Sequence, residues 1–261
     1  MCGIAGYSLS TASSLDPLAA ARVLIASVAE RGADAAGCAY LYEGDIEVCK
    51  QPGGASSFLE VVDVPDSVRH MLLHVRDFTK GRPSLMANNH PIRHGSIIGV
   101  HNGRITNDEQ VFAELGVGRA EPGMTVDSEA IFASLHYEDD IPLALGRLRG
   151  SLACGWLDEK RPDRVFLARG YGRPLWIGES VDHQAVMWAS TLEALEIAEE
   201  HLGLSLHKRP VRPGSILEIA DGAIVGIRSF TPDRTATWLV NPIASPEERT
   251  ACLARIDRSA S

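Results

Sequence analysis

The second residue of the chain is a cysteine, and a run of small and apolar residues, GIAGYSL at 3–9, follows it directly. Chain ends usually fray unless something ties them down, so this run predicts that the terminus enters a buried strand. A free thiol is also a reactive group that protein surfaces normally avoid. The opening of the sequence therefore predicts that Cys2 is a thiol mounted on a rigid strand.

A cysteine at the N-terminus carries a nucleophile and a base close together. When Met1 is removed, the α-amine of Cys2 becomes free, and such an amine titrates near about 7.7–8.0. It can accept and return a proton at neutral pH without a histidine. The alternative is that Cys2 is a buried thiol that only packs against its neighbours, which is the commoner role of a single cysteine.

The order of predicted elements indicates an α+β fold. Strands and helices come in separate blocks rather than in regular alternation, which is typical of a layered α+β domain. Asp16-Pro17 marks the start of the first helix, and Asp221-Gly222 the turn of a late hairpin. Helices are expected at 17–30, 108–115, 128–136, 142–147, 192–201 and 246–256. Strands are expected at 3–9, 37–42, 46–50, 69–77, 96–103, 151–158, 163–170, 174–179 and 185–190 and in a hairpin over 214–230, with a loop rich in Gly, Pro and Asn at 78–95.

Composition excludes several classes of protein. The 261 residues are 45% hydrophobic and 23% charged, as in ordinary globular proteins, and the net charge of −9 argues against nucleic-acid binding. No apolar run is long enough for a transmembrane helix. The most apolar early run has no basic leader before it, so we expect no signal peptide. Five cysteines without a CxxC pair predict neither a disulfide framework nor a zinc site, so we expect a reducing, cytoplasmic location and no metal or cofactor. We expect structural roles for the three neighbouring histidines, His90, His94 and His101, because their segment reads as loop and strand.

Three further positions carry groups that an amide-cleaving site needs. Arg76, leaving a buried strand, can present a two-pronged contact to a carboxylate. Asn102 and Gly103 offer an amide N–H beside a glycine N–H, which suits an oxyanion hole, and Asp127 before a helix could hold an ammonium group. Taken singly, each has a commoner explanation: a surface arginine, an Asn-Gly turn and a helix cap.

Together, the short motifs of the chain resemble one family. MCGIAGY, RGADAAG, HVRDFTKG, NNHPI, HNGRITN and VDSEAI occur in the same order as in class II glutamine amidotransferase domains. These are N-terminal nucleophile hydrolases, such as the glutaminase halves of glucosamine-6-phosphate synthase and amidophosphoribosyltransferase. LARGYGRPLWIGE, WASTLEAL and RPVRPGSILEI resemble the family's second half. The resemblance covers residues 2–230, and residues 231–261 are expected to form a C-terminal extension with a short helix, too short for a second catalytic domain.

The resemblance implies a four-layer αββα sandwich and the hydrolysis of L-glutamine to glutamate and ammonia through a γ-glutamyl thioester. It also implies that the reaction needs neither metal nor cofactor. By motif position, the implied roles are Cys2 as nucleophile, Asn102 and Gly103 as oxyanion hole, Arg76 for the substrate α-carboxylate, Asp127 for its α-ammonium, Thr79 as a lining residue of the pocket and Arg31 as a structural neighbour of the N-terminus.

The loop after Arg76 departs from the family pattern. In the sugar-synthase branch an aromatic residue and Ala-Thr-His-Gly follow the arginine, whereas this chain has DFTKG at 77–81. Three hypotheses stay open. The first is a stand-alone glutaminase subunit that passes ammonia to a separate synthase. The second is an amide hydrolase for another γ-glutamyl or amide compound, which the segment from Asp77 to Lys80 slightly favours. The third is a glutamine-binding or scaffold protein that keeps Met1. The helix expected at 246–256 could also pack on a second copy of the chain in a homo-oligomer.

Overall fold

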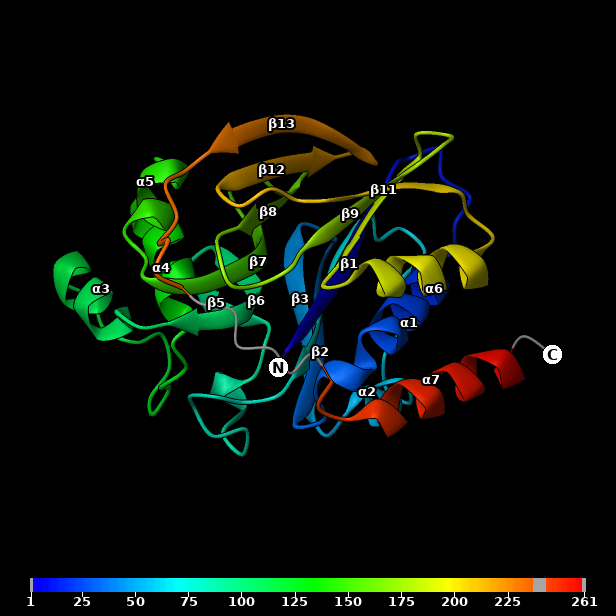
Figure 1. The fold of residues 1–261 in the computed structure, drawn as a ribbon, viewed down its shortest axis with the longest axis horizontal. Coiled ribbons are helices and arrows are strands. Elements are labelled where there is room, and N and C mark those ends of the chain that lie inside the picture. The colour runs from blue at the N-terminus through cyan, green and yellow to red at the C-terminus, as the bar shows by residue number, and fades with distance from the viewer. Residues whose placement is uncertain (1, 237–242, 260–261) are drawn as a thin grey trace.

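Two antiparallel β-sheets lie face to face between layers of helices in the computed structural model, which describes residues 2–236 and 243–259 (Figure 1). The seven-stranded sheet has the order β11 (Leu206–Pro210), β9 (Trp176–Ser180), β10 (Ala185–Ala189), β1 (Gly3–Leu9), β4 (His70–Arg76), β2 (Ala35–Tyr42) and β3 (Asp45–Pro52). The six-stranded sheet has the order β13 (Ala223–Ser229), β12 (Ser215–Ala220), β8 (Val165–Arg169), β7 (Gly150–Asp158), β6 (Ile97–Ile105) and β5 (Ile92–His94).

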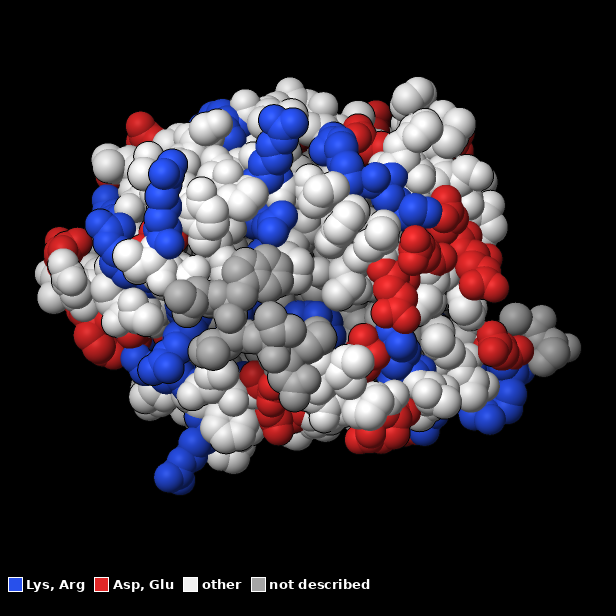
Figure 2. All heavy atoms as spheres, in the orientation of Figure 1, with Lys and Arg blue, Asp and Glu red and all other residues white. Residues whose placement is uncertain are grey.

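Helices cover the outer face of each sheet, which completes the predicted αββα order of layers. Helices α1 (Pro17–Ser27), α2 (Ala55–Phe58), α6 (Leu192–Leu202) and α7 (Pro246–Ser259) lie on the side of the seven-stranded sheet. Helices α3 (Asp108–Leu115), α4 (Glu129–Tyr137) and α5 (Ile141–Gly146) lie on the side of the six-stranded sheet. Among the described residues, no helix is long and apolar enough to span a membrane. Figure 2 shows acidic side chains gathered over α6 on one face of the molecule.

Three apolar clusters hold these layers together. One lies between the first helical layer and its sheet, a second between the other helical layer and its sheet, and the third fills the space between the two sheets. The cluster between the sheets includes Ile4, Leu72, Val100, Leu167 and Trp188, which are all fully buried. Because side chains alternate along a strand, central strands such as β1, β4 and β7 contribute to two of these clusters.

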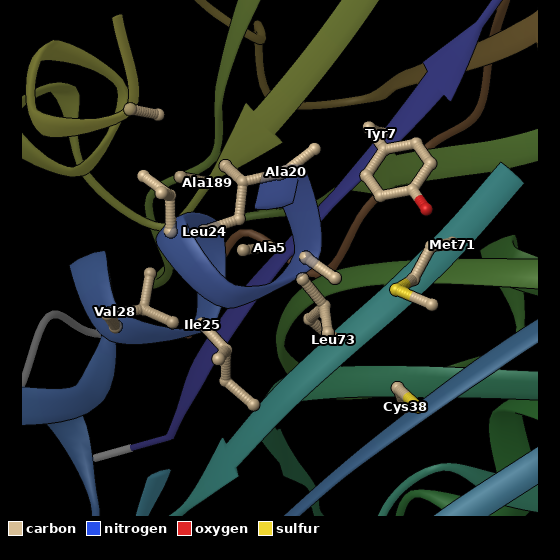
Figure 3. Packing of buried hydrophobic residues seen from close by; sticks show 14 of the residues in the cluster. Ala5, Tyr7, Ala20, Leu24, Ile25, Val28, Cys38, Met71, Leu73 and Ala189 are labelled. Carbon is tan, nitrogen blue, oxygen red and sulfur yellow. The ribbon is translucent and has the colours of Figure 1, made fainter. Parts of the chain in front are cut away.

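The first strand is buried on both of its faces, which explains its uninterrupted apolar sequence. Ala5, Tyr7 and Leu9 belong to the cluster under the first helical layer, whereas Ile4 belongs to the cluster between the sheets. Figure 3 shows Ala5 close to Leu24 of α1, with Tyr7 farther along the strand. The cysteine at position 2 therefore precedes a strand that packing fixes from two sides.

The first helix begins as its sequence predicts and ends earlier. The Asp16 carboxylate accepts hydrogen bonds from the amides of Leu18 (2.8 Å) and Ala19 (3.3 Å), and Pro17 occupies the first turn. The helix stops at Ser27, and a separate 3₁₀ turn, η1 (Ala29–Arg31), follows it. The predicted single helix over 17–30 is therefore wrong in its last turn.

Most of the other predicted elements are present, and the hairpin turns at Asp221-Gly222 as expected. Two short elements, η2 (Met86–Asn88) and β5, occupy part of the segment 78–95 that was expected to be a loop. Strand β11 and helix α2 were not predicted. Strand β11 is a polar strand at the edge of the sheet, and only its Leu206 is buried. Its sequence therefore lacks the alternation of apolar and polar residues that predicts a strand. The helix expected at 246–256 extends to residue 259.

Gly6 provides a test of the packing around β1. A Cβ atom at Gly6 would lie 2.2 Å from the Met71 carbonyl oxygen and 2.4 Å from the Trp188 ring, so any side chain must displace backbone or a buried indole. We expect Gly6→Ala to lower the free energy of unfolding by about 1–3 kcal/mol, measured from urea unfolding curves at constant m-value.

The matched control is Gly226→Ala in the edge strand β13. A Cβ atom at Gly226 would have its nearest neighbour, the Glu218 Cβ, at 3.4 Å, which is ordinary contact. This variant should keep the wild-type stability or gain less than about 1 kcal/mol. Equal midpoints for both variants would contradict the close packing of β1 against Trp188.

Candidate active site

Pairing of β1 with β4 places Cys2 beside Arg76. The register aligns Gly3 with Val75, so the next residues, Cys2 and Arg76, are neighbours where these two central strands of the seven-stranded sheet begin and end. The Cys2 thiol donates a hydrogen bond to the Asp77 carbonyl oxygen (Sγ–O 3.4 Å). Arg31, fully buried in η1, donates from Nε to the Cys2 carbonyl oxygen at 3.0 Å. The thiol is therefore held at a fixed place next to two arginines.

The electrostatic surroundings keep the Cys2 thiol protonated. Burial raises its pKa, and the positive charges of Arg76 and Arg31 act in the opposite direction without cancelling the effect. A thiol in this state needs a base to become a nucleophile. No carboxylate or imidazole is hydrogen-bonded to Sγ among the described residues, and a free α-amine on Cys2 would be the base nearest to it.

The Arg76 guanidinium is buried and carries its charge into the space between the sheets. Its Nη2 donates to the Lys80 carbonyl oxygen at 2.9 Å and also to that of Gly81, and its Nη1 donates to the Asn89 Oδ1. Burial lowers its pKa, while the charges of Cys2, Asp34 and Asp127 act to raise it. A buried arginine that is oriented by main-chain carbonyls is suited to a two-pronged contact with a carboxylate ligand.

Asn102 stands opposite Arg76 on the other sheet, and its amide is unpaired. Ile98 and Val100 of β6 belong to the cluster between the sheets, so Asn102, two residues farther along, faces the same space. Both polar atoms of its side chain are buried and have no hydrogen-bond partner among the described residues. Buried amides are rarely left unpaired because each lost hydrogen bond is costly, so this group is available for a ligand.

Gly103 lies inside β6, within the strand expected at 96–103. Its φ is +157°, and a Cβ atom there would lie 2.0 Å from the Ser151 carbonyl oxygen. A side chain is therefore excluded at this position.

A buried histidine links the two sheets at the level of the site. Burial lowers the pKa of His74 to about 3, so its imidazole is neutral, and Nε2 donates to the His101 carbonyl oxygen at 3.2 Å. His74 lies two residues before Arg76, and His101 one residue before Asn102. This hydrogen bond therefore fixes the positions of Arg76 and Asn102 relative to each other.

Asp127 is buried, and its carboxylate accepts a hydrogen bond from the Ile105 amide at 2.6 Å. Helix α4 begins two residues later, with Ser128 at its N-cap position, so the Asp127 side chain does not cap the helix. Burial raises the pKa of Asp127, and the Ile105 hydrogen bond acts to lower it. A buried carboxylate at this place can pair with a cation that enters the site.

Thr79 is exposed on the loop after Arg76, and its predicted place in the substrate pocket stays a prediction. Sequence reasoning missed three residues around the site. Asn88 and Asn89 are buried, and Asn89 bonds directly to Arg76; the consecutive asparagines in NNHPI were the available signal. The charge of Arg173, in the segment between β8 and β9, also interacts with that of Cys2.

The three neighbouring histidines do not form one cluster. His94 pairs with Glu129 (Nδ1–Oε1 2.9 Å), His90 stacks on His74 with ring centroids 4.2 Å apart, and the ring of His101 lies 2.9 Å (Nδ1–Oγ) from Ser128. Within the described part of the chain, no three His, Cys, Asp or Glu side chains come together as metal ligands would. The thiol, the unpaired amide and the two opposite charges are suited instead to nucleophilic attack on an amide compound. Such a compound would carry one positive and one negative group away from the amide.

Residues 74–197 match the family model of the glutamine amidotransferase domain. The chain is 30% identical over 254 residues to glutamine–fructose-6-phosphate aminotransferase (isomerizing) of Bacillus spizizenii, an alignment that covers 91% of this chain and 40% of that protein. It is 33% identical over 193 residues to the protein of the same name from Pyrococcus horikoshii, with 68% and 31% covered. The chain thus spans less than half the length of these relatives.

Solved structures share the fold. Glutamine phosphoribosylpyrophosphate amidotransferase from Bacillus subtilis superposes with a TM-score of 0.70 at 21% identity, covering 88% of this chain and 49% of that one. A class-II glutamine aminotransferase domain protein from Silicibacter pomeroyi has a TM-score of 0.52 at 16% identity, with 89% and 100% covered. The predicted N-terminal nucleophile hydrolase type of sandwich is confirmed by these likenesses.

The unpaired amide of Asn102 predicts that this residue contributes little to stability. Asn102→Leu, of similar volume, removes two unsatisfied polar atoms, so we expect the free energy of unfolding to stay within about 0.5 kcal/mol of wild type or to rise. The control is Asn89→Leu, which removes the partner of Arg76 and should cost about 1–3 kcal/mol. Urea unfolding of both variants checks this, and a larger loss for Asn102→Leu than for Asn89→Leu would contradict it.

Proposed function

The chain belongs to the class II glutamine amidotransferases, an enzyme family, and on that premise we propose that it hydrolyses L-glutamine to L-glutamate and ammonia with Cys2 as the nucleophile. One observation carries the proposal. Cys2, the unpaired amide of Asn102 and two buried opposite charges, Arg76 and Asp127, converge at one end of the space between the sheets.

The two charges define the substrate. A free amino acid carries a carboxylate and an ammonium on one carbon, and Arg76 and Asp127 would bind one each. The interaction is strong because both side chains are buried and water competes little. A general amidase would gain nothing from such a pair, so the arrangement favours a zwitterion whose side chain ends in an amide.

The first chemical step forms a thioester. With Met1 removed, the α-amine of Cys2 takes the thiol proton, and Sγ attacks the γ-carbonyl carbon of glutamine. The oxyanion that forms accepts hydrogen bonds from the Asn102 side-chain amide and the Gly103 N–H. The α-ammonium then returns the proton to the leaving nitrogen, the C–N bond breaks, and ammonia departs.

The second step regenerates the thiol. Water attacks the γ-glutamyl thioester and gives up a proton to the α-amine, and the same two donors stabilise the second oxyanion. The C–S bond breaks, the sulfur regains its proton, and glutamate leaves. No atom of this cycle needs a metal or a redox cofactor.

We also propose that the ammonia is used by a synthase on a separate chain, in the cytoplasm. Two relatives of the chain are named glutamine–fructose-6-phosphate aminotransferases, a name that includes glutamine and a second substrate. Phe78 and Leu85, which are 47% and 37% exposed, lie on the segment that follows Arg76 and would give a partner an apolar surface near the site.

Glutamate release from L-glutamine tests the proposal when the intact mass of the same sample is measured. Protein without Met1 should release glutamate, and Cys2→Ala should abolish release. Asn102→Ala should lower kcat by about 10²–10³, because one oxyanion donor is lost. Processed protein that leaves glutamine untouched but cleaves another γ-glutamyl amide would favour the alternative hydrolase, and near-normal turnover by Asn102→Ala would contradict the assigned oxyanion hole.

Binding of glutamine should depend on the protonation of Asp127. Its raised pKa means that the carboxylate, which holds the substrate ammonium, becomes neutral at a higher pH than an ordinary aspartate. Affinity is therefore full above that pKa and is lost as pH falls through it. Calorimetric titration of Cys2→Ala with L-glutamine between pH 4 and 7 should show the Kd rising toward acid. The Cys2→Ala/Asp127→Asn variant should bind weakly with no such dependence; an equal slope in both would contradict the role of Asp127.

A further inference from the structure

We propose that Lys80 is a positioning residue: its ion pair with Asp108 fastens the loop 77–81 to α3 and so holds Arg76 and Asp127 at the spacing that a zwitterionic substrate requires. The inference rests on the proposed function for the identity of the ligand, L-glutamine. It assigns a role to one of the residues at which this loop departs from the family pattern.

The side chain of Lys80 pairs with carboxylates of α3. Its Nζ pairs with the Asp108 Oδ2 and lies 3.8 Å from the Glu109 Oε1, both in the first turn of the helix. The Asp108 side chain is only 5% exposed, against 34% for Lys80. A pair with one buried partner is screened less by water and salt than a surface ion pair, so it can fix a loop.

Asp108 stays ionised at neutral pH. Burial acts to raise the pKa of its carboxyl, but hydrogen bonds from Lys80 and Arg119 outweigh burial and hold that pKa below its usual value. Losing the Lys80 ammonium would leave this buried carboxylate with Arg119 as its remaining cationic partner among the described residues.

The main chain of Lys80 is bonded to Arg76. The Lys80 carbonyl oxygen accepts from Arg76 Nη2 at 2.9 Å, and the next carbonyl, that of Gly81, accepts from the same nitrogen. The residue therefore joins two groups: its side chain is fixed on α3, and its backbone orients the guanidinium. If the side chain is released, the carbonyls that orient Arg76 are free to move.

The same network reaches Asp127. Arg119 donates to Asp108 Oδ2 at 2.9 Å and to the Val126 carbonyl oxygen at 2.7 Å, one residue before Asp127. Gly81 packs against this segment, since a Cβ atom there would lie 3.1 Å from the Val126 nitrogen, and its φ of +80° favours glycine. The loop that orients Arg76 is thus tied to the segment that carries Asp127.

Asn88 strengthens this connection from the other side. Its Oδ1 accepts from the amides of Thr125 (2.8 Å) and Val126 (3.1 Å), and its Nδ2 donates to the Arg82 carbonyl oxygen at 3.2 Å. Two separate bridges, through Asp108 and through Asn88, therefore join the loop to the segment before α4. Lys80 completes the first of these connections through its ion pair with Asp108.

The test replaces Lys80 in the full processed chain and follows glutamate release. In Lys80→Met we expect the KM for L-glutamine to rise about tenfold while kcat changes less than about threefold, because ground-state binding is lost and the Cys2 chemistry is kept. Lys80→Arg should restore the KM to within about threefold of wild type. A residue that only supported the fold would not produce this separation and rescue.

The matched control is Lys208→Met. Lys208 of β11 pairs with Glu199 of α6, and neither element carries a residue assigned to the site. Its KM and kcat should equal those of wild type. Should Lys80→Met fail to fold, Lys80→Gln, which keeps a polar chain without the charge, takes its place.

A second readout needs no substrate. Hydrogen exchange measured by mass spectrometry should show faster exchange of residues 77–82 in Lys80→Met than in wild type, Lys80→Arg or Lys208→Met. Unchanged KM and unchanged exchange would overturn the inference and leave the proposed function standing. Faster exchange in a protein that neither binds nor cleaves glutamine would support the fastening of the loop and overturn the proposed function instead.

Discussion

Hydrogen bonding and burial of β1 on all sides is the constraint on which the site depends. The strand pairs with β10 on one edge and β4 on the other, and its two faces belong to two different apolar clusters. At its start, the Ile4 amide donates to Ser190 Oγ and the Ser190 amide donates to the Ile4 carbonyl oxygen, each at 2.9 Å. A chain end would otherwise fray, and a nucleophile there would have no fixed position. Here the packing of Gly3–Leu9 holds Cys2 in place, so precise geometry at the terminus is a consequence of the core.

The site concentrates groups that would destabilise an ordinary core. Asn102 leaves a buried amide unpaired, and Arg76 and Asp127 place opposite charges in a space from which water is largely excluded. Each of these groups costs free energy of folding, and in the proposed function the binding of a zwitterionic amide would offset that cost. The His74–His101 hydrogen bond and the carbonyls around Arg76 keep them in place in the meantime. Residues that are held in place for binding therefore lower the free energy of unfolding of the chain.

Local signals in the sequence predicted much of the fold but little of how its parts meet. Asp16-Pro17 began α1 and Asp221-Gly222 turned the last hairpin, because caps and tight turns depend on adjacent residues. Strand β11 was missed because a polar edge strand lacks apolar alternation, and the hydrogen bond of Asn89 to Arg76 spans thirteen residues. The proximity of Cys2 to Arg76 follows from the β1–β4 pairing, which no local pattern contains. Resemblance to a family supplied those long-range relations at the site, whereas the Lys80–Asp108 pair, formed where the chain departs from the family pattern, needed the structure.

The structure also changes what the loop 77–81 implies about the substrate. The departure of the segment from Asp77 to Lys80 from the family pattern slightly favoured an amide substrate other than glutamine. In the fold, however, the Lys80 ammonium faces Asp108 and Glu109, and Asp77 meets the Cys2 thiol through its main-chain carbonyl. The added charge is thus paired with carboxylates of α3, and its effect on the pKa of Asp127 is smaller than those of burial and of the Ile105 hydrogen bond. In the proposed function, the buried charges that would select the ligand are those of Arg76 and Asp127, and they would favour free glutamine over an amide that lacks either charged end.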